Sequence, residues 1–191
     1  MEQHEIMQDE TQVINAVKKR EILHLRGKQW PKVCSPEEFF EWFCDFCHKT
    51  EHWIGDIQFR NDEEQFDSAF HCERDDLKPR KNDGCLSHYL NRISKLIENP
   101  GILVRHFQTV NHTLYGRLSV LARLITDRIG LPIQGVKVDV FISKSQKGFF
   151  ALHKDQIDVF TFCIQGQKYF QLWPFDVLAE ELSANPQSPM A

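Results

Sequence analysis

The stretch from residue 150 to residue 173 constrains the fold most, because a His-x-Asp pair runs directly into a segment with the composition of a β-strand. Aromatic and β-branched residues are concentrated between Val159 and Trp173, and Gly166 is placed to form a bend or a bulge. Alternate residues of a strand share a face, and the even-numbered positions here are mostly apolar. They are Phe160, Phe162, Ile164, Gly166, Lys168, Phe170 and Leu172. The pattern predicts a strand with one buried face that carries Lys168 inward.

The same stretch contains residue types that bind anions and metals. An ammonium group that faces a core needs an anionic partner, and a bound carboxylate would provide one for Lys168. His153 and Asp155 are two residues apart, so their side chains point the same way on an extended backbone. Two of the three ligands in a 2-His-1-carboxylate iron site use this spacing. Taken singly, each feature also has a structural interpretation, because a His-x-Asp pair arises by chance and a strand lysine is commonly a solvated edge residue.

Four residues carry a resemblance to a known family: His153, Asp155, Gly166 and Lys168. At this spacing they resemble the JmjC/cupin-like Fe(II)- and 2-oxoglutarate-dependent oxygenases, especially the ribosomal-oxygenase-like branch. The resemblance covers residues 101–175 and includes an upstream strand and loop at 135–148. It implies that His153 and Asp155 hold Fe(II) and that Lys168 binds the distal carboxylate of 2-oxoglutarate, with O2 as the second cosubstrate. The implied reaction is hydroxylation of a protein side chain or a related macromolecule, so a protein or peptide substrate is expected.

The sequence also departs from the pattern of that branch. Asp139 and Phe141 stand where the branch often has Asn and Tyr near the cosubstrate. The family takes its second metal histidine from a much later strand, whereas only 18 residues (174–191) follow Trp173 and none is a histidine. We therefore expect a catalytic domain that lacks the C-terminal half of the barrel and is inactive or incomplete as this chain. The alternative is a non-catalytic cupin-like interaction domain or truncated isoform, whose open sheet is covered by a homo-oligomer or a partner.

The fold class expected from these features is α+β. N-terminal helices and short strands should lead into the first half of a cupin/JmjC double-stranded β-helix, or jelly roll. The expected divisions are a polar N-terminal arm (1–20), a mixed helical and strand region (21–100), the partial JmjC/cupin-like domain (101–175), and a short helix with a polar tail (176–191). Short strands are expected at 21–26, 53–60, 101–110 and 136–143, and a solvated loop at 61–83.

Three helices have clear local signals. Ser35-Pro36-Glu37-Glu38 combines an N-cap, a first-turn proline and a capping-box glutamate. Apolar residues at helical spacing follow in each of the three segments. They are Phe39, Phe43 and Phe46 in the first; Leu86, Leu90, Ile93 and Ile97 in the second; and Leu114, Leu118, Leu121 and Ile125 in the third. Asn99-Pro100 should end the second helix and Gly130 the third.

Composition excludes several classes of protein. A net charge of −4 and a pI near 6.1 provide no electrostatic footprint for nucleic acid. No apolar run is long enough for a membrane span, and the N-terminus lacks the pattern of a signal peptide. Six cysteines without an export signal indicate reduced thiols, which predicts a cytoplasmic location and leaves the nucleus open.

Two further segments match metal or cofactor motifs, but packing in the core is the better interpretation of their cysteines. Cys44-x-x-Cys47-His48 matches the attachment motif of c-type haem, but it lies within a predicted amphipathic helix. Zinc could draw on Cys44, Cys47, His71 and Cys72, but their spacing fits no standard finger. Free cysteines are commonly small buried apolar residues, so we expect Cys44 and Cys47 to pack in the core. His106 and His112 are isolated and are expected at the surface or at a strand edge.

Overall fold

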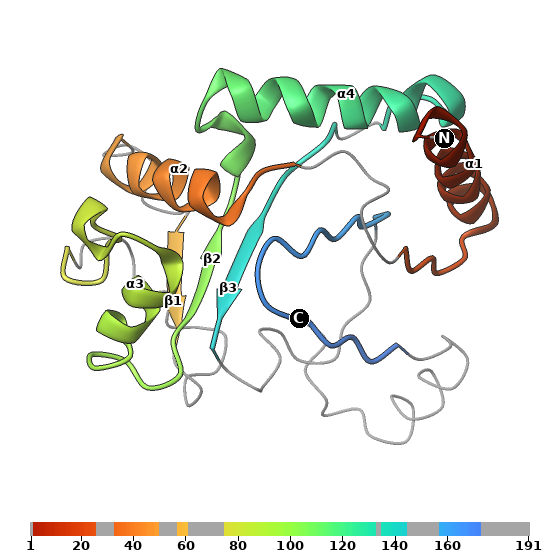
Figure 1. Cartoon of the computed structure of the whole chain (residues 1–191). Helices are drawn as coiled ribbons and strands as arrows, with labels where there is room; N and C mark the ends of the chain where they lie inside the picture. Colours follow the sequence, from red (N-terminus) through yellow and green to blue (C-terminus); the bar gives the residue numbers. More distant parts are fainter. Residues whose placement is uncertain are drawn as a thin grey trace. The chain divides into compact units, whose positions relative to one another are not determined.

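The computed structural model describes residues 2–25, 33–49, 57–60, 75–132, 135–144 and 157–172 (Figure 1). The chain divides into two compact units, Met1–Ser145 and Gln146–Ala191. All the helices and strands described lie in the first unit. In chain order they are α1 (Glu2–Lys19), α2 (Pro36–Lys49), β1 (Ile57–Arg60), η1 (Lys81–Asp83), α3 (Leu86–Ile93), β2 (Gly101–Val104), η2 (Phe107–Thr109), α4 (His112–Ile129) and β3 (Val140–Ser143), where η marks a 3-10 turn.

The three strands form one antiparallel sheet in the order β1-β2-β3 (Figure 1). Ile57 pairs with Val104 across the first strand pair, and Gly101 pairs with Ser143 across the second. All four residues of the central strand β2 are buried. This mixture of helices with a small sheet is compatible with the expected α+β class. The jelly roll stays a prediction.

Helix α2 begins where the sequence predicts and supplies an aromatic core. The backbone N–H of Ser35 donates to the Glu38 carboxylate (2.8 Å), and the N–H of Glu38 donates to the Ser35 hydroxyl (3.1 Å), which completes the capping box. Phe39, Phe43 and Phe46 are all buried. Phe39 and Phe46 pack on Phe107 of η2, while Phe40 and Phe43 pack on Tyr89 of α3. Helix α2 therefore links η2 and α3 through aromatic contacts in the core.

Helix α4 confirms the predicted apolar stripe and its end at Gly130. The side chain of Asn111 accepts a hydrogen bond from the N–H of Leu114 (2.8 Å) and caps the first turn. Leu114 and Leu121 are buried, and Gly130 ends the helix with φ +92°. Helix α1 packs against α4, and Val13 and Ala16 of α1 are buried. The first residues of the chain thus form a helix that packs through a narrow apolar side.

The elements are shorter than their sequence patterns suggest. Residues 21–25 are described but form no strand. The strand predicted at 101–110 stops at Val104, because His106 adopts φ +56° and opens the η2 turn. Because β2 ends at Val104, β3 is paired only from Val140 onward. Val138 lies before the strand, where its carbonyl still accepts a hydrogen bond from the N–H of Phe107 (3.0 Å). A strand is only as long as the strand beside it.

Helix α3 ends at Ile93, six residues before the predicted stop at Asn99. The hydroxyl and the N–H of Ser94 both donate to the carbonyl of Leu90, at 2.6 and 3.0 Å. This local competition favours a helix end over continuation. Ile97 is consequently half-buried in the turn that follows. Among the helices described, none is long and apolar enough to cross a membrane.

Candidate functional site

The structure describes the expected cosubstrate lysine but not the expected iron ligands. His153 and Asp155 lie outside the described residues, so no geometry is assigned to the metal pair. Gly166 and Lys168 lie in the described segment 157–172, which belongs to the second unit.

Segment 157–172 does not form the predicted strand, and its apolar face is not buried. No residue in it is helical or in a sheet. Phe160, Phe170 and Leu172 are 39%, 54% and 58% exposed, whereas Phe162 and Ile164 are half-buried. A strand satisfies its backbone only by pairing, and no backbone-to-backbone hydrogen bond links this segment to other residues that the structure describes. The alternation identified which side chains share a face, but a neighbouring strand is also needed to bury that face.

Gly166 makes the expected bend. Its φ of +80° lies in the region that favours glycine, and the chain bends at Gln165 and Gly166. The exposed thiol of Cys163 donates across this bend to the carbonyls of Gln165 (3.7 Å) and Gly166 (3.5 Å).

Lys168 is an exposed residue, not the inward-facing one that the alternation predicts. Its Nζ lies 5.2 Å from the centroid of the Phe170 ring. Partial burial of the ammonium lowers the pKa of Lys168, and the Cys163 thiol opposes this shift. Lys168 is thus an exposed residue whose ammonium is partly desolvated. Partial desolvation would strengthen a contact between this ammonium and an anion.

The two positions at which the sequence departs from the resembling branch lie in or beside β3. Asp139 is exposed, and Phe141 is 41% exposed. His106 is half-buried at the end of β2, and His112 is the exposed first residue of α4. His112 is thus at the surface, as expected, whereas His106 is half-buried and caps the start of η2.

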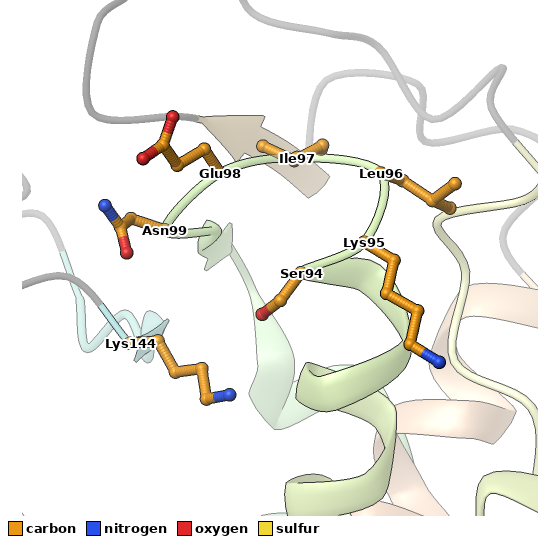
Figure 2. Close-up of a pocket in the computed structure, with 7 residues that line it drawn as sticks. All are labelled: Ser94, Lys95, Leu96, Ile97, Glu98, Asn99 and Lys144. Carbon is orange, nitrogen blue, oxygen red and sulfur yellow. The ribbon is translucent and has the colours of Figure 1, made fainter.

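A shallow hollow of about 530 Å³ lies beside the end of β3 (Figure 2). Six of its lining residues come from the turn after α3, and the seventh is Lys144, which follows β3. They are Ser94, Lys95, Leu96, Ile97, Glu98, Asn99 and Lys144. The Lys144 ammonium donates to the side chain of Asn91 (2.7 Å) and is held at the rim by this bond. Two ammonium groups and one carboxylate in an open hollow do not make a metal or acid–base site.

The cysteines of α2 are packing residues. Cys44 and Cys47 are 1% and 3% exposed. Burial, together with the nearby carboxylates of Asp83 and Asp45, raises the pKa of Cys44 to about 11, so its thiol stays protonated at neutral pH. Within the described ranges, no three His, Cys, Asp or Glu side chains are placed to hold a metal ion. His71 and Cys72 of the zinc alternative lie outside those ranges.

A polar cluster centred on Arg92 was not predicted from the sequence. Its guanidinium donates to both oxygens of Asp83 (2.8 and 2.9 Å) and to the carbonyls of Asp76 and Lys78 (2.6 Å each). The cluster holds residues 76–83 against α3, and Leu77 within this stretch is fully buried. Proline and charged residues dominate this stretch, so its composition suggested a solvated loop. The position of Arg92 on α3 likewise gave no indication in the sequence that it would bind this stretch.

Comparison with known proteins adds no family assignment. No family model matches the chain, and no curated protein or solved structure is significantly similar to it. The metal and cosubstrate assignments therefore depend on the sequence pattern and on the chemistry of the residues themselves.

Proposed function

We propose that the chain carries part of the site of an Fe(II)- and 2-oxoglutarate-dependent hydroxylase of a protein side chain or a related macromolecule, and that it is inactive or incomplete as this chain. The observation that carries the proposal is the spacing of His153-x-Asp155 and Gly166-x-Lys168, with the lysine 15 residues after the histidine. An imidazole nitrogen and a carboxylate oxygen are two of the three ligands that suit non-haem Fe(II). When bound, Fe(II) would activate O2, the oxidant, whose two oxygen atoms would end in succinate and in the substrate hydroxyl, with 2-oxoglutarate and the substrate C–H each giving two electrons; the third protein ligand is left unassigned.

The described geometry of Lys168 is compatible with the role proposed for it. Its exposed ammonium is partly desolvated beside Phe170 and follows the bend at Gly166. A dicarboxylate chelating a metal at one end would present its other carboxylate to this cation. The resulting charge-assisted hydrogen bond would orient the cosubstrate.

The first prediction concerns the metal pair. His153→Ala or Asp155→Ala should weaken binding of Mn(II), used as a stable substitute for Fe(II), by at least about tenfold, since losing even an outer-shell partner costs about that much. Calorimetry under argon would measure the affinity. His112→Ala is the matched control, because it removes an exposed histidine from α4. Equal Mn(II) affinities in all three variants would rule out the metal assignment.

The second prediction concerns Lys168. Lys168→Met keeps the apolar stem and deletes the charge, so it should weaken 2-oxoglutarate binding by about 10- to 150-fold, as expected for losing about 1.5–3 kcal/mol from a charged hydrogen bond. Calorimetric titration of 2-oxoglutarate into the Mn(II)-loaded chain would measure this. Lys137→Met, which removes another exposed ammonium, should leave the affinity unchanged. If Lys168→Met binds as tightly as the control, Lys168 is not the carboxylate partner.

A second candidate function is a non-catalytic interaction module. The exposed apolar side chains of segment 157–172 favour it, because contiguous apolar surface commonly marks a protein-binding site. Binding separates the two candidates. Binding of Mn(II) and 2-oxoglutarate that His153→Ala and Lys168→Met weaken would support the oxygenase site, even where the chain alone does not sustain succinate release. A chain that binds neither Mn(II) nor 2-oxoglutarate but associates through 157–172 would support the module.

A further inference from the structure

Segment 157–172 combines exposed apolar side chains with very few charges. Six large apolar residues in it are at least 39% exposed: Ile157, Val159, Phe160, Tyr169, Phe170 and Leu172. Its only charged residues are Asp158 and Lys168, both exposed and of opposite sign. Strand-forming residues with exposed apolar side chains and little charge are suited to pairing with another strand. The positions of the two charges indicate which partner strand would pair with this segment.

We propose that this segment pairs with the same segment of a second copy of the chain, as antiparallel strands related by a two-fold axis at Cys163. Asp158 and Lys168 are each five residues from Cys163, on opposite sides. In this register Asp158 of each copy faces Lys168 of the other, so one interface contains two opposite-charge pairs. Such cross-strand pairs are stabilising, and like charges in the same positions are destabilising. The surface is self-complementary, as a two-fold interface requires.

The same register also matches the apolar side chains. Phe162 of one copy faces Ile164 of the other, and Phe160 faces Gly166. Even-numbered residues thus meet even-numbered residues, and the apolar faces of the two strands coincide. An aromatic ring can cover the backbone at a glycine opposite, which compensates for the missing side chain. Gly166 now has φ +80°, and as a glycine it can adopt extended backbone without steric cost.

Other arrangements of the two strands fit less well. Parallel pairing in register would place Asp158 beside Asp158 and Lys168 beside Lys168. A shift of one residue would bring the apolar face of one strand against the polar face of the other. A shift of two residues keeps the faces but places Asp158 opposite Gly166 or Phe170, so both charge pairs are lost. The two-fold register at Cys163 therefore satisfies charge and face together.

This pairing does not depend on the proposed oxygenase function, although both use Lys168. An ammonium that faces Asp158 of a second copy is not available to the carboxylate of 2-oxoglutarate. A two-stranded ribbon is also only marginally stable by itself. We therefore expect a dimer whose population rises with protein concentration.

Charge exchange tests the register in the full chain. Sedimentation velocity over a concentration series should show a monomer–dimer equilibrium for the unaltered chain. Asp158→Lys and Lys168→Asp should each raise the dimer dissociation constant about tenfold or more, because the symmetry doubles every like-charge contact. The double variant, with both charges exchanged, should restore the dimer. Asp127→Lys and Lys137→Asp make the same charge changes at exposed positions elsewhere and should have no effect.

A monomer at all concentrations, single variants that dimerise normally, or a double variant that stays monomeric would each overturn the proposal. So would open-ended association, because a two-fold contact closes at two copies. Circular dichroism of each variant would confirm that the helices are retained.

Cross-linking through Cys163 provides an independent measurement. Cross-strand residues at the two-fold axis have Cα atoms about 4.5–5.5 Å apart, which lies within the range of about 4.4–6.8 Å that a disulfide spans. Oxidation by diamide should therefore give a covalent dimer that dithiothreitol reverses and that Cys163→Ser abolishes. Asp158→Lys should slow its formation, and the double charge exchange should restore it. A covalent dimer that persists in Cys163→Ser, or one unaffected by Asp158→Lys, would contradict the register.

Discussion

Replacing Phe43 with alanine should lower the free energy of unfolding by about 3–5 kcal/mol, the usual cost of truncating a fully buried aromatic side chain. Phe43 is 0% exposed. Its ring stacks on Phe39 (centroids 5.9 Å apart) and meets the Tyr89 ring edge-on (5.6 Å). The substitution leaves a cavity where α2 meets α3, and the closely packed core can collapse only partly around it. Urea denaturation followed by helical circular dichroism would measure the loss.

Tyr115→Ala provides the control for this experiment. Tyr115 is also a helical aromatic residue, but it is 59% exposed on α4. Its truncation should change the free energy of unfolding by no more than about 0.5 kcal/mol. Similar losses in the two variants would mean that the core is not organised around Phe43.

The helices were predictable because their signals are local. The capping box at Ser35 and the phenylalanines that follow it define the start of α2 and its buried face within a few residues of sequence. Gly130 likewise defines the end of α4. Where local groups compete, the prediction was wrong by six residues: α3 ends at Ile93, where the Ser94 hydroxyl competes for the Leu90 carbonyl, before the apolar stripe ends.

Strand limits were less predictable because they depend on residues far away in the chain. Alternation at 136–143 correctly marked a strand there, but β3 is limited to four residues by the end of its neighbour β2. That end comes from the left-handed conformation of His106, which no residue pattern indicated. The register between strands is likewise a tertiary property.

The prediction of the candidate site was likewise limited by its dependence on residues elsewhere in the chain. The pattern at 157–172 correctly placed the bend at Gly166, but it predicted an inward-facing Lys168, and that residue is exposed. The pattern was wrong about burial, because alternation describes which side chains share a face and not whether another strand covers that face. The interpretation of His153 and Asp155 as metal ligands stays a prediction, since both lie outside the described residues.

The Arg92 cluster leads to the second large expected effect. Arg92→Ala should lower the free energy of unfolding by about 3 kcal/mol, because it leaves a buried carboxylate without its counter-ion. The Asp83 side chain is only 8% exposed, and the carbonyls of Asp76 and Lys78 lose their donor in the same step. Arg92 itself is 24% exposed, so the expected loss lies at the lower end of the range for buried pairs. Arg123→Ala, at an exposed position on α4, should be nearly neutral.

The pH dependence of the same variant distinguishes loss of the ion pair from loss of packing. Burial alone would raise the pKa of Asp83, but the hydrogen bonds from Arg92 and from the N–H of Arg80 outweigh it and hold the pKa below its usual value. A carboxyl whose pKa is lower in the folded state stabilises the fold above its unfolded pKa of about 3.9. That stabilisation disappears as the pH falls through the lowered folded value. The difference between the unaltered chain and Arg92→Ala should therefore be largest near neutral pH and should narrow below about pH 4. Urea denaturation at a series of pH values would measure it, and a difference that does not change with pH would show that Arg92 acts through packing alone.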